Sequence, residues 1–361
     1  MDQKLQDELQ QLMSFKPITS DTDATRALIT YVAKRLQKIG LKVMIHSDGD
    51  FYSLVAGSRS LKRSALLLQA HIDVVPAPNK LFVLRRAGDR LLGRGTYDML
   101  FATASFIVAL ENLAASGQLD NIDVGVMLTS DEEIGGKTSG MARIEAYRCG
   151  VCFLPDAGGK DQMSIGSKGV LELELTMTGK SGHAARPLEY VNPIYDLSDV
   201  IQKLRQAFPN VDPLATTASL TVVQAGKTFN QVPDSARLVA DIRYIPEDDP
   251  KQLIVTVTAI AAACNGTVRI IELEPPFKAD PSDPRLRQFI RHYQDQTSRH
   301  IELINAPGAT DARFFAPQAT PVIMIRPDGG GLHAPDESVS LSSLVEFTEV
   351  LTTYIAIIGT S

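Results

Sequence analysis

Five short segments of this chain end an apolar run with a histidine or an acidic residue, and Gly or Pro lies nearby in each. Such positions are where strands stop and turns begin. In α/β proteins, side chains at the carboxyl ends of parallel strands gather in one crevice. The pattern therefore predicts an α/β domain that builds one site from distant parts of the chain. The residues concerned are His71, Asp73, Asp98, Glu132, Glu133, Asp156 and His333.

Apolar periodicity supports this fold class in the first half of the chain. Residues 28–39 repeat apolar side chains at helical spacing, and residues 103–116 are also expected to be helical. Nearly continuous apolar runs at 65–71, 123–131 and 151–157 indicate buried strands. This alternation favours a mostly parallel sheet with helices on both faces.

The middle of the chain follows a different pattern. From Gly169, apolar and charged residues alternate, which is typical of a half-exposed antiparallel strand. The elements that follow give the order βαββαβ, which predicts a ferredoxin-like α+β domain. They are a helix at 192–207, strands near 219–226 and 236–245, a helix at 250–263 and a strand at 267–273.

The domain organisation follows from these two patterns. A chain of 361 residues exceeds the usual size of one hydrophobic core. We expect a discontinuous catalytic, metal-binding domain at 1–166 and 277–361. The ferredoxin-like domain, at 167–276, would be inserted into it as a lid or dimerisation domain.

Composition limits which partners and which cellular compartment we expect. The net charge is −6 without a block of like charges, which argues against nucleic-acid binding. No apolar run approaches the roughly 18 residues of a membrane span. The N-terminus is polar and amphipathic, and three cysteines fit a reducing compartment. We therefore expect a cytoplasmic protein with neither a nucleic-acid nor a membrane partner.

The acidic and histidine residues suit a catalytic metal site. Carboxylates and imidazoles without thiolates fit zinc, manganese or cobalt, and one carboxylate can bridge two cations. Asp73 lies two residues after His71, on the same side of an extended chain, so its carboxylate can hold the second ring nitrogen. In extended backbone Glu132 and Glu133 point in opposite directions. One could then ligate a metal while the other faces the attacking water.

Five ordered motifs carry a resemblance to a known family. They are HIDVVP at 71–76, GRGxxDM at 93–99, DEExGG at 131–136, SGHAARP at 181–187 and LHxxDE at 332–337. Together they resemble the co-catalytic zinc hydrolases that include acetylornithine deacetylase, succinyl-diaminopimelate desuccinylase, aminoacylase and carboxypeptidase G. The resemblance spans essentially the whole chain and places the inserted domain where the family has it.

The resemblance implies a role for each residue of the metal site. His71, Asp98 and Asp156 would hold one Zn²⁺, and Asp98, Glu133 and His333 would hold a second, with Co²⁺ or Mn²⁺ as possible substitutes. Glu132 would be the general base, and Asp73 would be the partner of His71. The peptide bond between Asp98 and Met99 would be cis.

The resemblance also implies residues that act on the substrate. His183 would polarise the scissile carbonyl, and the family often supplies this histidine from the other subunit of a homodimer. The remaining substrate contacts would come from Asn230, Arg243, Gly308 and Thr310. In two places the chain departs from the family: Leu100 and Phe101 replace the usual Lys-Gly, and the common tryptophan after HIDVVP is missing.

We therefore expect a dinuclear zinc hydrolase that cleaves the amide bond of a small N-acyl amino acid or short peptide, of the deacylase, desuccinylase or carboxypeptidase type. An aminopeptidase or dipeptidase with the same metals is the alternative, and it would need an acidic pocket for the substrate ammonium. A catalytically inactive binding protein is disfavoured because Glu132 and every expected ligand are present. Glu337 is expected to form a structural ion pair, and Cys149 and Cys152 to be core thiols.

Overall fold

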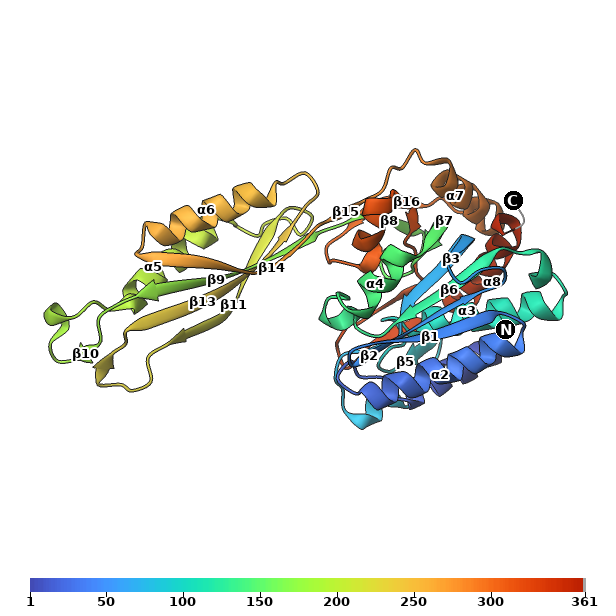
Figure 1. The fold of residues 1–361 in the computed structure, drawn as a ribbon, viewed down its shortest axis with the longest axis horizontal. Coiled ribbons are helices and arrows are strands. Elements are labelled where there is room, and N and C mark those ends of the chain that lie inside the picture. The colour runs from blue at the N-terminus through green and yellow to red at the C-terminus, as the bar shows by residue number, and fades with distance from the viewer. Residues whose placement is uncertain (360–361) are drawn as a thin grey trace. The chain divides into compact units, whose positions relative to one another are not determined.

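The computed structural model describes residues 1–359, which form two compact units (Figure 1). Unit 1 comprises Met1–Ile165, Ala279–Ile304 and the chain from Thr310 onward. Unit 2 comprises Gly166–Lys278 and Asn305–Ala309. The chain therefore leaves unit 1, builds most of unit 2 and returns.

A six-stranded sheet organises unit 1. β3 pairs in parallel with β6 and β7, and β7 pairs in parallel with β17, whereas β1 and β2 are antiparallel at the other edge. The carboxyl ends of β3, β6 and β7 therefore meet at one edge of the sheet. In spatial order the strands are β1 (Lys42–Asp48), β2 (Phe51–Gly57), β6 (Val124–Thr129), β3 (Arg63–His71), β7 (Arg148–Phe153) and β17 (Val322–Ile323).

Helices cover this sheet. α2 packs on β1 and β2, α3 and α8 pack on β3 and on each other, and α7 packs on β17. The length and composition of α8 would allow it to cross a membrane, but 56% of it is buried, which is typical of a core helix. The helices of unit 1 are α1 (Asp2–Ser14), α2 (Thr22–Lys38), α3 (Leu100–Ala115), α4 (Ser139–Ala146), α7 (Pro284–Thr297) and α8 (Leu341–Ile358).

A second, smaller sheet of unit 1 brings two distant loops together. β19 pairs with β5, so the loop after β5 and the loop between β18 and β19 lie side by side. These loops carry Asp98 and His333. The strands, in spatial order, are β18 (Gly329–Gly330), β19 (Ser338–Ser340), β5 (Arg90–Leu92) and β4 (Arg85–Ala87).

Unit 2 has the βαββαβ order that the sequence predicts. All strand pairs of its four-stranded sheet are antiparallel, and leucines of β9 pack with α5 and α6 in the core. In chain order the elements are β9 (Gly169–Thr178), α5 (Pro193–Ala207), β11 (Thr217–Ala225), β13 (Ser235–Tyr244), α6 (Pro250–Ala262) and β14 (Gly266–Glu274), and the sheet order is β11-β13-β9-β14.

Short elements complete the fold. β10 (Gly182–His183) and β12 (Gln231–Val232) form a two-stranded sheet in unit 2. A three-stranded sheet, β15 (Phe277–Lys278), β8 (Gln162–Ser167) and β16 (Glu302–Ala306), contains the strands through which the chain passes from one unit to the other. The 3₁₀ turns are η1 (Asn79–Phe82), η2 (Leu119–Asn121), η3 (Glu132–Ile134), η4 (Pro187–Glu189) and η5 (Asp311–Gln318).

Candidate metal centre

The predicted metal ligands converge at the carboxyl edge of the parallel strands of unit 1. His71 is the last residue of β3, Glu133 follows β6 and Asp156 follows β7. Asp98 immediately precedes the segment that opens α3, and His333 lies between β18 and β19. The crevice predicted from strand ends is therefore present, and the small sheet supplies its other side.

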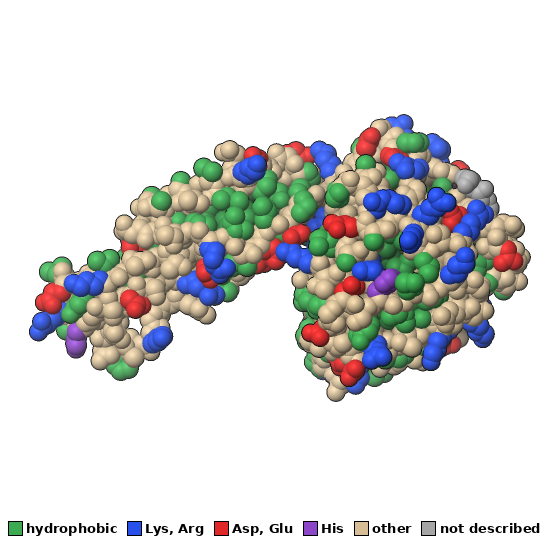
Figure 2. All heavy atoms as spheres, viewed as in Figure 1, with side chains coloured by type: hydrophobic (Ala, Val, Ile, Leu, Met, Phe, Trp, Pro, Cys, Tyr) green, Lys and Arg blue, Asp and Glu red, His purple; other side chains and the backbone are tan. Residues whose placement is uncertain are grey.

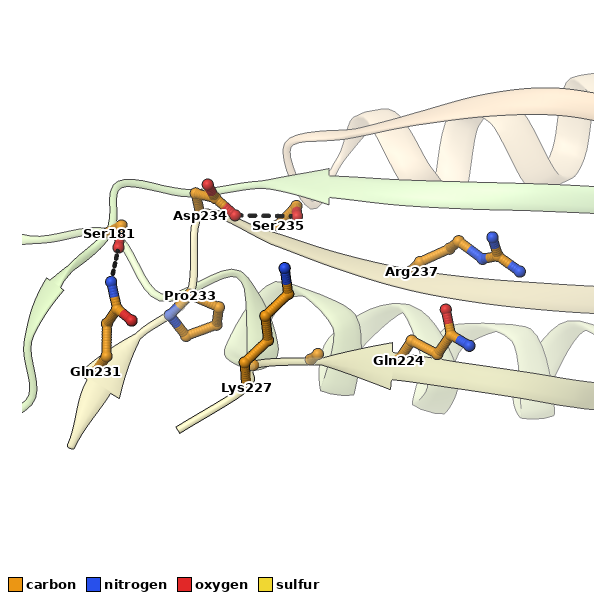
Figure 3. Close-up of a pocket in the computed structure, with 10 residues that line it drawn as sticks. Ser181, Gln224, Lys227, Gln231, Pro233, Asp234, Ser235 and Arg237 are labelled. Atoms are coloured by element: carbon orange, nitrogen blue, oxygen red, sulfur yellow. Dashed lines mark hydrogen bonds between the residues drawn. The ribbon is translucent and has the colours of Figure 1, made fainter. Parts of the chain in front are cut away.

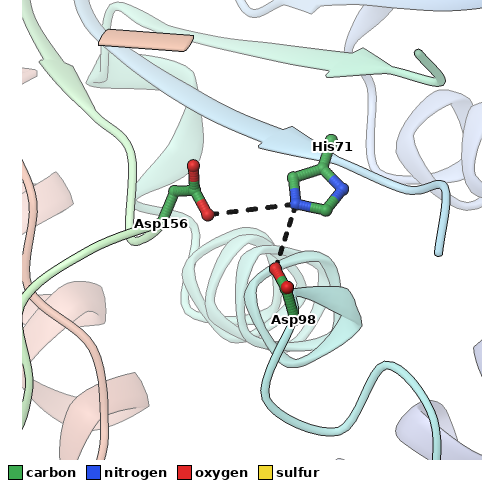
Figure 4. A group of neighbouring side chains, drawn as sticks. All are labelled: His71, Asp98 and Asp156. Carbon is green, nitrogen blue, oxygen red and sulfur yellow. Dashed lines mark hydrogen bonds and ion pairs between the residues drawn. The ribbon is translucent and has the colours of Figure 1, made fainter. Parts of the chain in front are cut away.

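Two groups of three ligands share Asp98. The His71 Nε2 atom lies 3.3 Å from Asp98 Oδ1 and 3.9 Å from Asp156 Oδ1 (Figure 4). The His333 Nε2 atom lies 3.2 Å from Asp98 Oδ2 and 3.0 Å from Glu133 Oε2. Within each group the ligand atoms all lie within 4.8 Å of one another. Asp98 thus turns one oxygen to each histidine, as a bridging carboxylate must.

The environment of these groups fits divalent cations. Glu133 Oε1 is buried and has no hydrogen-bond partner. Burial raises the pKa of Glu133 to about 8 and that of Asp156 well above its usual value. Although burial opposes it, hydrogen bonds to His333 and His71 lower the pKa of Asp98. Buried carboxylates crowded in this way need a compensating positive charge, and oxygen and imidazole donors suit Zn²⁺, Mn²⁺ or Co²⁺.

The ring of His71 is held by Asp73 chiefly through the backbone. His71 Nδ1 lies 3.0 Å from the Asp73 carbonyl oxygen and 3.5 Å from Asp73 Oδ1. A proton on Nδ1 leaves Nε2 with its lone pair facing Asp98 and Asp156. The carboxylate of Asp73 accepts hydrogen bonds from Thr19 Oγ1 at 2.9 Å and from the amides of Glu132 and Glu133 at 3.3 and 3.2 Å.

The backbone conformation of Glu132 and Glu133 differs from the extended one that the sequence predicts. Glu132 and Glu133 lie in the 3₁₀ turn η3, so the prediction of extended backbone is wrong. The Asp73 carboxylate explains the turn, because it accepts from both amides at once. The two side chains still take different directions. Glu133 Oε2 lies beside His333, whereas Glu132 Oε2 lies 4.0 Å from His71 Nε2. Burial raises the pKa of Glu132, as suits a general base.

A buried ion pair links the two loops that carry Asp98 and His333. Arg94 Nη1 lies 2.5 Å from Glu337 Oε2, and Arg94 Nη2 donates to the His333 carbonyl oxygen at 2.9 Å. Glu337 Oε1 also accepts from the amides of Tyr97 and Asp98, at 2.9 and 3.1 Å. The prediction that Glu337 forms a structural ion pair is confirmed, and the pair fixes the position of Asp98.

The segment after Asp98 departs from the pattern of the family that the sequence resembles. Leu100 and Phe101 are fully buried at the start of α3. No peptide bond among the described residues is cis, so the predicted cis bond between Asp98 and Met99 is wrong. A cis bond outside proline costs about 3–4 kcal/mol, and the structure keeps the trans form.

The residues predicted to contact the substrate are divided between the units. His183 and Asn230 are exposed and lie close together in unit 2, where the Ala184 amide donates to the Asn230 carbonyl oxygen at 3.0 Å. Arg243, on β13, is paired with Asp241 of the same strand at 2.7 Å. The Gly308 carbonyl oxygen, also in unit 2, accepts from the Lys168 amide at 3.1 Å.

Thr310 belongs to unit 1, where it begins η5, and its Oγ1 accepts from the Ala312 amide at 3.2 Å. Its hydroxyl therefore serves the local backbone. Cys149 and Cys152 are free thiols on β7, and Cys152 is buried, as expected for the core.

Three residues support the site: Asp311 and Arg313, which the sequence indicates, and Thr19, which sequence reasoning missed. Asp311 is buried and its Oδ1 has no hydrogen-bond partner. Burial, and next the charge of Glu132, raise the pKa of Asp311 to about 8. Arg313 Nη2 donates to the Gly135 carbonyl oxygen at 2.6 Å and so holds the end of η3. The signal for both is the charged pair in TDAR, at 310–313; Thr19 has no comparable motif.

Each unit also has a cavity of about 430 Å³. In unit 2 it lies beside β12, where Gln231 donates to Ser181 and Lys227 extends from the segment after β11 (Figure 3). In unit 1 the cavity is lined in part by Glu133, one of the predicted metal ligands.

The sequence model of peptidase family M20/M25/M40 matches residues 67–357. Among curated proteins, the chain is 27% identical to a succinyl-diaminopimelate desuccinylase of Psychromonas ingrahamii, with 95% of each chain covered. It is 29% identical to the enzyme of the same name from Xanthomonas euvesicatoria, over 90% of this chain and 92% of the relative.

Solved structures show the same fold. An M20 family metallo-carboxypeptidase from Sulfolobus solfataricus superposes with a TM-score of 0.81 at 18% identity and covers 100% of both chains. A tripeptidase from Staphylococcus aureus superposes with a TM-score of 0.80 at 17% identity, over 100% of this chain and 99% of the other.

Proposed function

The chain belongs to peptidase family M20/M25/M40, and we propose that this metal-dependent hydrolase is a dinuclear zinc enzyme that deacylates small N-acyl amino acids. The family match includes Glu132 and every predicted metal ligand. The observation that carries the proposal is the position of Asp98, whose two oxygens face two separate histidines at 3.3 and 3.2 Å. A carboxylate shared in this way is expected when two cations lie side by side.

Five residues would hold the two cations. Bound there, Zn²⁺ would polarise the scissile carbonyl and acidify the attacking water. The mixed nitrogen and oxygen donors favour Zn²⁺, and Co²⁺ or Mn²⁺ could replace it. His71, Asp98 and Asp156 would form one site, and Asp98, Glu133 and His333 the other.

Glu132 is the proposed general base. It belongs to neither ligand group, yet its Oε2 lies 4.0 Å from His71 Nε2, at the edge of the site. Its carboxylate would take a proton from the attacking water and pass it to the leaving amine. Asp73 would act as a positioning residue, because it holds the His71 ring and the Glu132 amide together.

The substrate class follows from the relatives. Both desuccinylases named above are aligned over at least nine-tenths of this chain, which supports an N-acyl amino acid. The alternative is a peptidase with the same metals, since the structural neighbours include a tripeptidase and a carboxypeptidase. Both reactions hydrolyse an amide, so the metal centre is the same in either case.

We further propose that the enzyme is a cytoplasmic homodimer in which unit 2 mediates dimerisation and supplies His183 to the partner's active site. Leu188 and Phe229, near His183 and Asn230, are fully exposed. Figure 2 shows apolar side chains gathered at the position of α6, where Val255 is 59% exposed. Apolar patches of this kind mark interaction surfaces. The three cysteines form no disulfide among the described residues, which supports the proposed cytoplasmic location.

Metal analysis combined with a substrate screen tests the proposed function. The purified protein, loaded with Zn²⁺, would be assayed against N-acetyl and N-succinyl amino acids and against dipeptides with a free amine. Two metals per chain and hydrolysis of acylated amino acids are expected. Cleavage of dipeptides alone would favour the peptidase, and metal-independent turnover would contradict both.

A further inference from the structure

The cavity of unit 1 opens beside the second metal group. Its volume is about 430 Å³, which lies within the range of about 300–1,000 Å³ typical of small-molecule sites. Glu133 is part of its wall, and Ile134, the next residue, is 62% exposed. The other apolar walls come from Ile18, Phe51, Val75 and Pro76. A large apolar side chain that is exposed beside a catalytic site is placed to contact the substrate.

Hydrogen bonds connect the wall of this cavity to the metal centre. The segment before α2 pairs with the segment after β3, where the Thr19 amide donates to the Val74 carbonyl oxygen at 3.3 Å. Thr19, which lines the cavity, also donates its hydroxyl to Asp73, the residue that holds the His71 ring. The cavity wall and the catalytic turn therefore form one connected structure in unit 1.

The charged lining residues limit which substrate groups the cavity can bind. Its charged lining residues are Asp50 and Glu133, and none of the lining residues is Lys or Arg. In the zinc-loaded enzyme the cations would compensate Glu133, so a carboxylate in the cavity would face Asp50 without a cationic lining side chain, which is unfavourable. The amino-acid part of an N-acyl amino acid brings its own carboxylate. The acyl group is the part that can be free of charge. The ammonium group of a free peptide would also suit this acidic lining, and the dipeptide assay described above distinguishes the two.

We propose that this cavity is the acyl-group subsite and that it selects an uncharged apolar acyl chain over a succinyl group. The inference rests on the proposed deacylase function and deepens it. It separates this chain from relatives that carry the name desuccinylase, because a succinyl group ends in a carboxylate. Ile134 and Phe51 would contact the chain, and Asp50 would exclude an acidic end.

Rates of hydrolysis for a series of acyl groups on one amino acid test the proposal. N-acetyl, N-butyryl, N-hexanoyl and N-succinyl derivatives would be compared by kcat/KM with the zinc-loaded full-length enzyme. Burial of each added methylene predicts a rise of roughly threefold to fourfold until the cavity is filled. N-succinyl, although it has the same number of carbon atoms as butyryl, should be cleaved more slowly.

Two variants test whether the cavity causes the preference among acyl groups. Phe51→Ala removes an apolar wall and should reduce the ratio of hexanoyl to acetyl rates by roughly tenfold. Asp50→Lys should raise the succinyl rate relative to butyryl by about fivefold, the size of an exposed charge interaction. Met44→Ala on the same hairpin and Asp120→Lys on the surface of the same unit lie outside the cavity and serve as controls.

The outcomes separate this inference from the proposed function. Hydrolysis that is fastest with N-succinyl, or a chain-length preference that Phe51→Ala leaves unchanged, would overturn the acyl subsite while the deacylase remains. An enzyme that binds zinc but cleaves no acylated amino acid would overturn both.

Discussion

The two units of the molecule present their functional residues in opposite ways. In unit 1 the side chains of His71 and Asp73 are almost fully buried, and each makes hydrogen bonds to neighbours in the same site. In unit 2 His183 and Asn230 are exposed at a two-stranded ladder of two residues a side. Unit 1 therefore fixes its groups through buried contacts before any substrate binds, whereas the exposed His183 ring accepts at Nδ1 from the amide of Ala185, two residues away, at 3.1 Å.

This difference assigns separate tasks to the units. A metal site needs ligands held at close range, and the Arg94–Glu337 pair and Asp73 provide that rigidity. An exposed histidine among exposed apolar side chains such as Leu188 and Phe229 is instead suited to meet another surface. Metal binding should depend on unit 1 alone, and completion of catalysis should depend on unit 2.

Asp98→Ala is expected to have the largest effect. The substitution removes a ligand from both groups, so both metals should be lost and turnover should fall to background. Metal content per chain, measured by elemental analysis beside kcat, checks this. Asp120→Ala, a surface carboxylate of unit 1, is the control. Retention of two metals and normal turnover in Asp98→Ala would remove the bridging role.

Glu132→Gln should affect chemistry without affecting metal binding. The amide keeps the shape of the side chain but cannot accept the proton, and loss of a general base typically lowers kcat by about 10²–10⁴-fold. The metal content should equal that of the wild type. If metal and activity fall together, Glu132 is a ligand and the division of roles between Glu132 and Glu133 is incorrect.

His183→Ala tests the part of the comparison that concerns unit 2. Loss of a group that stabilises the developing oxyanion should lower kcat by about 10²–10³-fold, with both metals retained. The variant would then be mixed with Glu132→Gln under conditions of subunit exchange. A hybrid dimer that uses His183 across the interface has one site with both residues intact and should recover up to half of the activity.

The mixture of His183→Ala and Glu132→Gln can also contradict the proposed role of His183. Proven exchange without recovery would mean that His183 acts within its own chain or has no role in the reaction. Mixing Glu132→Gln with Asp98→Ala is the matched control, because both substitutions lie in unit 1 and no hybrid site is complete.

Thr19→Val should have the smallest effect, a loss of stability, because it removes a hydrogen bond that supports the metal site of unit 1. The valine cannot donate to the buried Asp73 carboxylate, and the loss of a hydrogen bond to a charged group costs about 1.5–3 kcal/mol. The free energy of unfolding, measured by urea denaturation, should fall by that amount. Thr19→Ser keeps the hydroxyl and should restore most of the loss. Equal stability of Thr19→Val and wild type would show that Asp73 needs no such donor.

The strand-end pattern predicted the metal centre in part, because His71, Glu133 and Asp156 end or follow parallel strands. Asp98 and His333 instead lie on loops of the small antiparallel sheet. A sheet brings strand ends together whatever the length of chain between them, so His71 and Asp156 could be matched from apolar runs alone. The βαββαβ order of unit 2 was visible for a similar reason, since alternation and helical spacing differ along the chain.

The supporting contacts could not be read in this way. Thr19 reaches Asp73 only because two loops pair at Ile18 and Val74, and neither loop has a periodic pattern. The 3₁₀ turn at Glu132 depends on the Asp73 carboxylate, which lies 59 residues away in the chain. Side chains that act through a tertiary contact leave no local signal in the sequence.

Anomalous diffraction from crystals grown with Zn²⁺ would locate the cations and so test the dinuclear site. Two zinc peaks are expected in unit 1, about 3.5–4 Å apart, with Asp98 between them. One peak should lie against His71 and Asp156, and the other against Glu133 and His333. A single peak, or two peaks that do not share Asp98, would contradict the dinuclear site.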